Sequence, residues 1–210
     1  MNTVVVYVHG LWLRGGEAWL LRHRLSHALC CPTYAFSYAS MSADAATHTR
    51  ALGEYLRSIR AAQVHLVGHS LGGVLLARLF ESGFVPPAPG RIVLLGAPLR
   101  GSRAAQRFVR LPCGSRMLGA TAREELLAPR PHHLRIDRDV GVIAGNWPVG
   151  LGRLLGSLKA PSDGTVLVEE TVVEGVSAAR EMRVSHSGLL FSTAVARQTA
   201  AFLRDGHFEV

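Results

Sequence analysis

The segment Gly68–Gly72, which reads GHSLG, constrains the fold of this chain more than any other feature. It ends the apolar run VHLVG, and the apolar run LLARLF follows closely. The chain must therefore pass from a buried strand to a buried helix, expected at 71–81, within a few residues. Glycines two residues before and two after Ser70 leave room where a Cβ would collide in so tight a turn. The sequence predicts a serine hydroxyl that projects above the carboxyl edge of a sheet, at the N-terminus of a helix.

Apolar runs typical of buried strands alternate with stretches of helical periodicity along most of the chain. Strands are expected at 3–8, 32–38, 64–68, 91–95, 140–144 and 180–184, and helices at 17–29, 44–61, 71–81 and 189–203. Asp44 is expected to cap the second of these helices. The alternation predicts the α/β class, with about six mostly parallel strands and helices on both faces of the sheet.

The chain of 210 residues suits a single domain spanning 1–210. Residues 99–131 show no strand pattern, and short helices are expected around 104–109 and 123–127. This stretch is expected to form a cap-like or platform excursion over the carboxyl ends of the strands, where such sheets bind ligands. Residues 146–164 are expected to form a loop, and 165–168 fit either a hairpin or a helix.

Charge in this chain is basic and uneven. The net charge is +8, and Lys159 is the only lysine. No nucleic-acid motif accompanies this charge, so we expect no nucleic-acid partner. The stretch Arg100–Arg135 holds eight arginines against Glu124 and Glu125. It is interpreted either as a solvated basic face or as a site for an anionic head group, a coenzyme A phosphate or a membrane surface, with weak association.

The cysteines and the N-terminal residues bear on the expected cofactors and location. Cys30, Cys31 and Cys113 form neither a disulfide framework nor a metal-ligand pattern, so no metal and no organic cofactor is implied. The N-terminal residues lack the basic region and cleavage site of a signal peptide, and no run reaches the ~20 apolar residues of a membrane span. The expected location is cytoplasmic. No feature of the sequence indicates an oligomeric state.

A serine in such a turn needs a base and an acid, which follow it in the order acid, then histidine. His186 comes after the strand at 180–184 and before the last helix, so it is the predicted base. His207 lies in the tail beyond that helix, and His9 precedes Ser70 and is expected to organise its own loop.

The predicted acid is Asp163, in the turn PSDG that follows the strand at 140–144. This position places it at the carboxyl end of the sheet. Asp137 and Asp139 precede the same strand, at its amino end and away from Ser70. Asp163 would hold the imidazole of His186 in one tautomer. The alternative is an ordinary Asp-Gly turn.

The turn after the first strand carries a second signal, His9-Gly10-Leu11. The backbone N–H groups of Leu11 and Leu71 are predicted to form an oxyanion hole, in which each donor contributes roughly 3–4 kcal/mol. Trp12 and Trp147 are candidates for lining an acyl pocket, and ordinary packing is the alternative for both.

These segments resemble the α/β-hydrolase superfamily, and within it the small, lidless bacterial lipases and esterases. The matching segments, spread over nearly the whole chain, are VVVYVHGL, VHLVGHSLGG, SDGTV and VSHSGLLFS. The resemblance implies Ser70, Asp163 and His186 as a catalytic triad and the amides of Leu11 and Leu71 as oxyanion donors. The turn GAP at 96–98 is similar to one in lipase-like members, including the inositol deacylases of GPI anchors. The stretch 99–131 is longer and richer in arginine than in a minimal lipase, which leaves the acyl-chain preference open.

The function predicted from the sequence is that of a serine carboxylic-ester hydrolase, an esterase or lipase of lipid metabolism acting on a small-molecule ester or acyl substrate. A thioesterase or an acyltransferase would use the same triad. A hydrolase fold that only binds is the third alternative, and the loss of Ser70 or His186 would have been its signature.

Overall fold

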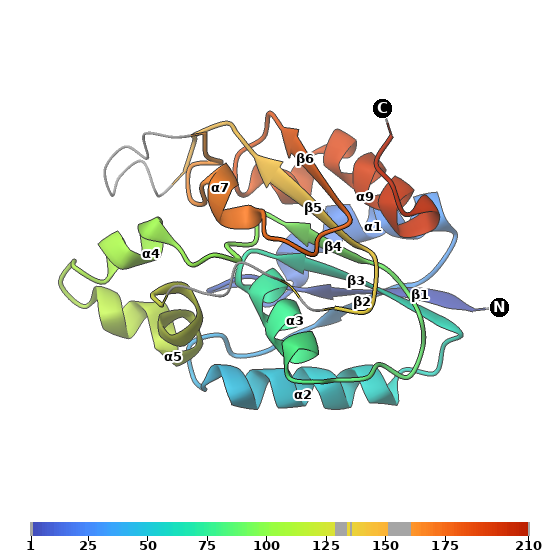
Figure 1. Ribbon diagram of the computed structural model, residues 1–210, viewed down its shortest axis with the longest axis horizontal. Helices are drawn as coiled ribbons and strands as arrows, with labels where there is room; N and C mark the ends of the chain where they lie inside the picture. The colour runs from blue at the N-terminus through green and yellow to red at the C-terminus, as the bar shows by residue number, and fades with distance from the viewer. Residues whose placement is uncertain (1, 129–133, 135, 151–160, 210) are drawn as a thin grey trace.

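One sheet of six strands forms the centre of the computed structural model, which describes residues 2–128, 134, 136–150 and 161–209 (Figure 1). Its strands are β1 (Thr3–Val8), β2 (Thr33–Phe36), β3 (Gln63–His69), β4 (Ile92–Leu95), β5 (Val140–Gly145) and β6 (Ala178–Met182). Their order in the sheet is β2-β1-β3-β4-β5-β6, and every neighbouring pair is parallel. The predicted α/β class with about six parallel strands is confirmed.

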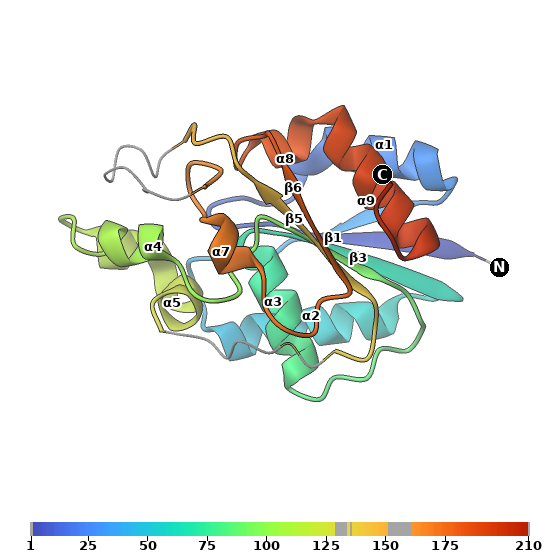
Figure 2. The ribbon, with the colours of Figure 1, turned by 45° about the horizontal axis from the view of Figure 1, so that its top comes forward.

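Helices cover both faces of this sheet, because successive side chains of a strand point to opposite sides. The main helices are α1 (Trp19–Leu29), α2 (Ala45–Ser58), α3 (Leu71–Glu81), α8 (Gly188–Phe191) and α9 (Thr193–Asp205), and the turn Gly16–Ala18 precedes α1. Val4, Val6 and Val8 of β1 join the core under α2 and α3, whereas Val5 and Tyr7 join the core under α1 and α9. Figure 2 shows α2 and α3 on one face of the sheet and α1 and α9 on the other. The near-continuous apolar strands are therefore buried on both sides.

Local capping explains where several helices begin and end. Asp44 accepts a hydrogen bond from the backbone N–H of Thr47 at 2.8 Å, which confirms its predicted role as N-cap of α2. Ser192 caps α9 in the same way, with Val195 as donor. At the C-terminal end of α1, Cys30 adopts a left-handed conformation with φ of 50°, and its side chain is exposed and lies outside the core.

Two helices, α4 (Arg103–Phe108) and α5 (Gly114–Leu126), lie beyond the carboxyl ends of the strands, at the left in Figure 1. The helix α5 begins at Gly114, well before the stretch around 123–127 where the sequence indicated a helix. It is interrupted at Gly119, where φ is 75° and a Cβ would lie 2.7 Å from the Cα of Met41. A small apolar cluster joins these helices to the start of α3; it contains Leu71, Val74, Ala105, Leu118, Ala122 and Leu126.

The segment after β5 forms a turn and then a short helix. Ser162 and Leu167 form an isolated antiparallel bridge, and α7 (Val168–Thr171) follows directly. The stretch 165–168, which fitted a hairpin or a helix, thus closes a turn and enters a helix. Part of the predicted loop 146–164, namely 151–160, lies outside the described residues. No helix in the described part of the chain is long and apolar enough to cross a lipid bilayer.

Candidate active site

Ser70 occupies the turn between β3 and α3 in a conformation that few residues adopt. Its φ of 53° and ψ of −124° lie outside the regions favoured by L-amino acids, a strain that proteins keep mainly at functional positions. Its backbone N–H donates to the carbonyl oxygen of Leu95 at 2.9 Å. This bond continues the pairing of β3 with β4 and fixes the turn. Since α3 begins at Leu71, the Ser70 side chain lies at the positive end of a helix dipole.

The two motif glycines have no room for a side chain. A Cβ at Gly72 would lie 2.2 Å from the carbonyl oxygen of Val8, and a Cβ at Gly68 would lie 2.5 Å from the Cα of Gly73. Both contacts are to backbone, which cannot move aside without shifting a strand or a helix. The tight approach of α3 to β1 and β3 therefore explains the spacing seen in the sequence.

Asp163 and His186 lie together at the carboxyl end of the sheet. The Nδ1 atom of His186 is 2.6 Å from Oδ2 of Asp163, a carboxylate that is 1% exposed. The other carboxylate oxygen accepts the backbone N–H groups of Thr165 at 2.9 Å and Val166 at 2.7 Å. With its acceptors directed in this way, Asp163 holds the proton of His186 on Nδ1 and leaves Nε2 as an acceptor.

Gly96 brings this pair to the end of β4, the same strand end that binds the backbone of Ser70. A Cβ at Gly96 would lie 3.1 Å from Oδ2 of Asp163 and 3.2 Å from Nδ1 of His186. The preceding residue, Leu95, is the one whose carbonyl oxygen accepts from Ser70. The sequence singled out Gly96 only through the resemblance of its turn. The φ of 54° and this close approach explain why a glycine stands there.

His69, the second residue of the motif, supports the loop that carries His186. It is buried, and its Nε2 lies 3.2 Å from the carbonyl oxygen of His186, with 4.7 Å between the two ring centres. Because Nε2 must carry the proton to donate here, Nδ1 is left as an acceptor, and no described residue bonds to it. Burial, reinforced by the neighbouring His186, holds the pKa of His69 well below its ordinary value.

The loop after β1 is held by a buried pair of stacked rings, His9 and Tyr38, 4.2 Å apart. Nε2 of His9 accepts from the backbone N–H of Tyr38 at 3.1 Å, so its Nδ1 donates to the carbonyl oxygen of Gly10 at 2.8 Å. The Tyr38 hydroxyl donates to the carbonyl oxygen of His9 at 3.0 Å. Burial lowers the pKa of His9, which keeps the ring neutral. His9 thus organises its loop, as expected.

This loop presents its backbone to Ser70. A Cβ at Gly10 would lie 3.1 Å from the Cβ of Ser70. In the described part of the chain, no acceptor is bonded to the N–H groups of Leu11 and Leu71, whereas the next amide, that of Trp12, donates to Oγ of Ser40 at 3.1 Å. The two predicted oxyanion donors are therefore available to a ligand.

The sequence did not predict that the loop after β2, which supplies Tyr38 and Ser40, supports the loop after β1. Its only signal was the strand-like stretch PTYAFSY, in which no polar residue has a spacing that indicates function.

Both candidate pocket tryptophans are about half exposed. Trp12, at 44%, donates from Nε1 to the carbonyl oxygen of Met117 at 2.8 Å and lies 5.6 Å from the ring of Phe108. It therefore joins the loop after β1 to α4 and α5. Trp147, at 48%, follows β5, and its backbone N–H donates to Val184 at 3.2 Å. Both tryptophans lie at the same end of the sheet as Ser70.

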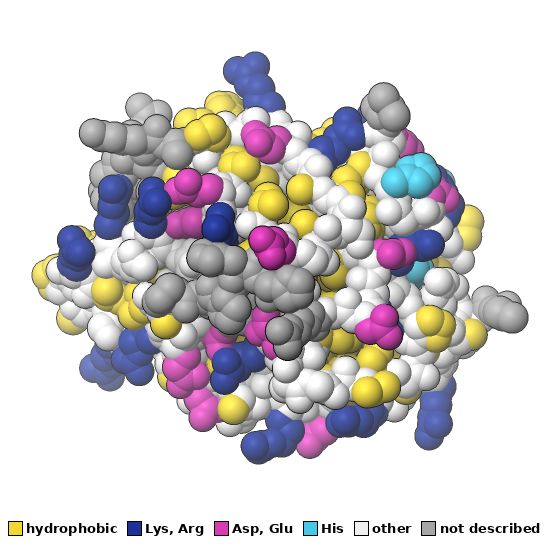
Figure 3. Space-filling view, in the orientation of Figure 1, with side chains coloured by type: hydrophobic (Ala, Val, Ile, Leu, Met, Phe, Trp, Pro, Cys, Tyr) yellow, Lys and Arg dark blue, Asp and Glu magenta, His cyan; other side chains and the backbone are white. Residues whose placement is uncertain are grey.

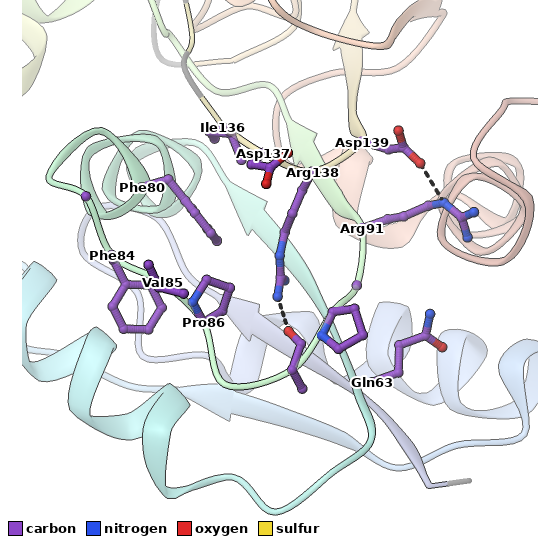
Figure 4. Close-up of a pocket in the computed structure, with 14 residues that line it drawn as sticks. Gln63, Phe80, Phe84, Val85, Pro86, Arg91, Ile136, Asp137, Arg138 and Asp139 are labelled. Carbon is purple, nitrogen blue, oxygen red and sulfur yellow. Dashed lines mark hydrogen bonds and ion pairs between the residues drawn. The ribbon is translucent and has the colours of Figure 1, made fainter.

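A cavity of about 720 Å³ lies at the opposite end of the sheet, against the residues that begin β3, β4 and β5 (Figure 4). There Arg138 donates to the carbonyl oxygens of Ala88 and Val64, and Arg91 pairs with Asp139 at 3.0 Å. Burial lowers the pKa of Arg138 to about 10. Asp137 and Asp139 both line this cavity, as their place before β5 predicted, so neither can serve Ser70. In the described residues, no group of three or more His, Cys, Asp or Glu could hold a metal ion.

The fold and the arrangement of the site agree with one family of proteins. Residues 5–204 match the family model described as the alpha/beta hydrolase family, and the chain belongs to this family. No curated protein matches the sequence.

Solved structures with the same fold share little sequence with the chain. The mature lipase BlEst2 of Bacillus licheniformis is 16% identical, with 95% of this chain and 90% of that chain covered and a TM-score of 0.67. A pyrethroid hydrolase of Sphingobium faniae is 15% identical, with 98% of both chains covered and a TM-score of 0.61. The metagenomic carboxyl esterase MGS0156 is 15% identical, with 88% of this chain and 64% of that chain covered and a TM-score of 0.59. At these identities the likeness concerns the fold, and the activity must be argued from the site.

Proposed function

We propose that this chain is a serine hydrolase that cleaves carboxylic esters of small molecules through an acyl-enzyme. The observation that carries the proposal is the contact of 2.6 Å between Asp163 and His186 at the end of β4, the strand that also binds the Ser70 turn. A strained serine, an oriented imidazole and a buried carboxylate are the parts that acyl transfer needs. The family and its lipase and esterase relatives support the same class of reaction.

The reaction begins with the transfer of the Ser70 hydroxyl proton to Nε2 of His186. The Ser70 oxygen bonds to the ester carbonyl carbon, and the carbonyl oxygen becomes an oxyanion that the N–H groups of Leu11 and Leu71 stabilise. Asp163 stabilises the imidazolium while it lasts. The C–O bond to the alcohol then breaks, and His186 returns its proton to the leaving oxygen.

Deacylation repeats these steps with water. His186 takes a proton from water, the hydroxide attacks the acyl carbon, and Ser70 leaves with the proton of His186. Each half-reaction uses the same oxyanion hole. We assign the half-exposed Trp12 and Trp147, at the same end of the sheet as Ser70, to the lining of the acyl path.

The test is hydrolysis of p-nitrophenyl esters of increasing acyl length, together with labelling by a fluorophosphonate. We expect turnover and labelling for the wild type and for Ser58→Ala, an exposed serine on α2, but neither for Ser70→Ala. Labelling with turnover of thioesters alone would redirect the proposal to a thioesterase. The absence of both labelling and turnover would overturn it in favour of a binding protein.

A further inference from the structure

The stretch that contains α4, the connection after it and most of α5 carries only positive charge. Residues 101–123 contain five arginines and neither Asp nor Glu. Arg103 is paired with Glu169 at 3.0 Å, and Arg123 bonds to Ser115. Arg110 and Arg116 are exposed, and in the described part of the chain no acceptor is bonded to their guanidinium groups. Two cationic groups are therefore presented to solvent with no counter-ion among the described residues.

Large apolar side chains are exposed beside these arginines. Leu111 is 47% exposed and Met117 49%, and Trp12, bonded to the carbonyl of Met117, is 44% exposed. We name the surface formed by residues 110–117 and Trp12 the α4–α5 tip. It projects at the left end of the molecule in Figures 1 and 2, and Figure 3 shows dark blue and yellow side chains side by side over α4 and the connection that follows it.

We propose that the α4–α5 tip is a docking surface for an anionic phospholipid bilayer. Arginines bind lipid phosphates, and half-exposed leucine, methionine and tryptophan side chains enter the boundary between head groups and acyl chains. The large exposed apolar side chains of the tip are three, Trp12, Leu111 and Met117, whereas a stable protein interface takes ~800 Å² from each partner. A second copy docked by the same tip would place arginine against arginine. The charge pattern therefore favours a lipid surface.

Docking at the tip brings the bilayer to the active-site end of the molecule. Trp12 lies two residues after Gly10, at which a Cβ would be 3.1 Å from the Cβ of Ser70, and Leu118 of α5 packs with Leu71 in one apolar cluster. A lipid-embedded ester would thus reach Ser70 without crossing bulk water. The docking itself requires no hydrolysis, so it can be tested independently of the proposed function.

The experiment is co-sedimentation of the Ser70→Ala protein with phosphatidylcholine vesicles that contain either no phosphatidylglycerol or about 30% of it. We expect binding to the anionic vesicles, and a large loss of it between about 50 mM and 0.5 M salt. Each arginine near an anionic surface contributes roughly fivefold, so Arg110→Glu with Arg116→Glu should weaken binding by roughly 25-fold or more. The matched control, Arg57→Glu in the last turn of α2 with Arg60→Glu just after this helix, changes the net charge equally and should have a much smaller effect.

A second variant separates insertion from charge. Leu111→Ser with Met117→Ser keeps every arginine and should weaken binding by roughly tenfold. Equal binding to neutral and anionic vesicles, or equal loss in the two arginine variants, would refute the docking surface. Retained tip-dependent binding with no ester hydrolysis would support docking and count against the proposed function alone.

Discussion

Replacing Asp163 by Asn is the sharpest test of the site, because the structure dictates which way the new amide must face. Oδ1 accepts two backbone N–H groups, at 2.9 and 2.7 Å, and Asn can satisfy them only with its carbonyl oxygen. Its NH₂ group then faces Nδ1 of His186, at the position where Oδ2 now lies 2.6 Å away. Nδ1 must become an acceptor, so Nε2 carries the proton and cannot take one from Ser70.

The size of the loss in kcat follows from what it costs the variant to return His186 to the active tautomer, with its proton on Nδ1, which can happen in two ways. Turning the amide round leaves two buried N–H donors unbonded, at about 1–3 kcal/mol each. Keeping it in place sets a donor against a donor at hydrogen-bond distance, at a similar cost. In both orientations of the amide, the variant also lacks the negative charge that stabilises the imidazolium. Together these costs lower kcat by about a thousandfold to ten-thousandfold, at about 1.4 kcal/mol for each tenfold step.

Steady-state hydrolysis of the best p-nitrophenyl ester, combined with urea unfolding, measures both effects. We expect kcat to fall while the free energy of unfolding changes by less than about 1 kcal/mol, since the bonds to Thr165 and Val166 remain. Asp139→Asn is the matched control, because that carboxylate pairs with Arg91 at the other end of the sheet. A variant of Asp163 that keeps more than a tenth of the wild-type kcat would refute the assignment of Asp163 as the acid.

Three further predictions concern stability and the loops around Ser70. Gly72→Ala places a Cβ 2.2 Å from a backbone oxygen and should lower the free energy of unfolding by about 3 kcal/mol or more, whereas Gly16→Ala, with open space around it, should change it little in the same urea titration. Burial and nearby arginines lower the pKa of His65 to about 4. Between pH 4 and 6.5 the unfolded chain therefore binds more protons than the folded chain, so the free energy of unfolding should fall as the pH drops through that range, by up to about 3 kcal/mol. His65→Asn should flatten this pH dependence in urea titrations and the exposed His23→Asn should not; equal curves for the two variants would contradict the reasoning. Tyr38→Phe removes the hydroxyl that holds the loop after β1 and should lower the free energy of unfolding by about 1 kcal/mol. Its kcat should fall by a larger factor than its KM rises. An unchanged kcat would show that the loop needs no such support.

The sequence was sufficient for features that depend on local chemistry. Buried parallel strands must be apolar on both faces, so their runs were visible, and the space between α3 and β1 requires the glycines around Ser70. The positions of Asp163 and His186 followed from the strand ends that precede them. These arguments needed the order of elements along the chain and no knowledge of distances.

Other features depend on contacts between distant segments and could not be predicted. Tyr38 and Ser40 act on the loop after β1 because β2 pairs with β1, which no local pattern reveals. Gly119 interrupts the periodicity of α5 where the helix meets Met41, so the start of α5 was placed too late. The exposure of Cys30 likewise has no signal in the sequence, because it follows from the left-handed residue that ends α1.

The order of the strands has a consequence for biosynthesis. The strands around Ser70, namely β1, β3 and β4, are all encoded before residue 96, whereas Asp163 and His186 arrive with the loops that follow β5 and β6. A ribosome-bound chain that has emerged only as far as Gly145 holds the serine turn and both predicted oxyanion amides, yet it lacks the predicted acid and the predicted base. Under the proposed mechanism, such a nascent chain has no means of cleaving an ester. The ability to react would be switched on only when the last quarter of the polypeptide has been made and has joined the sheet.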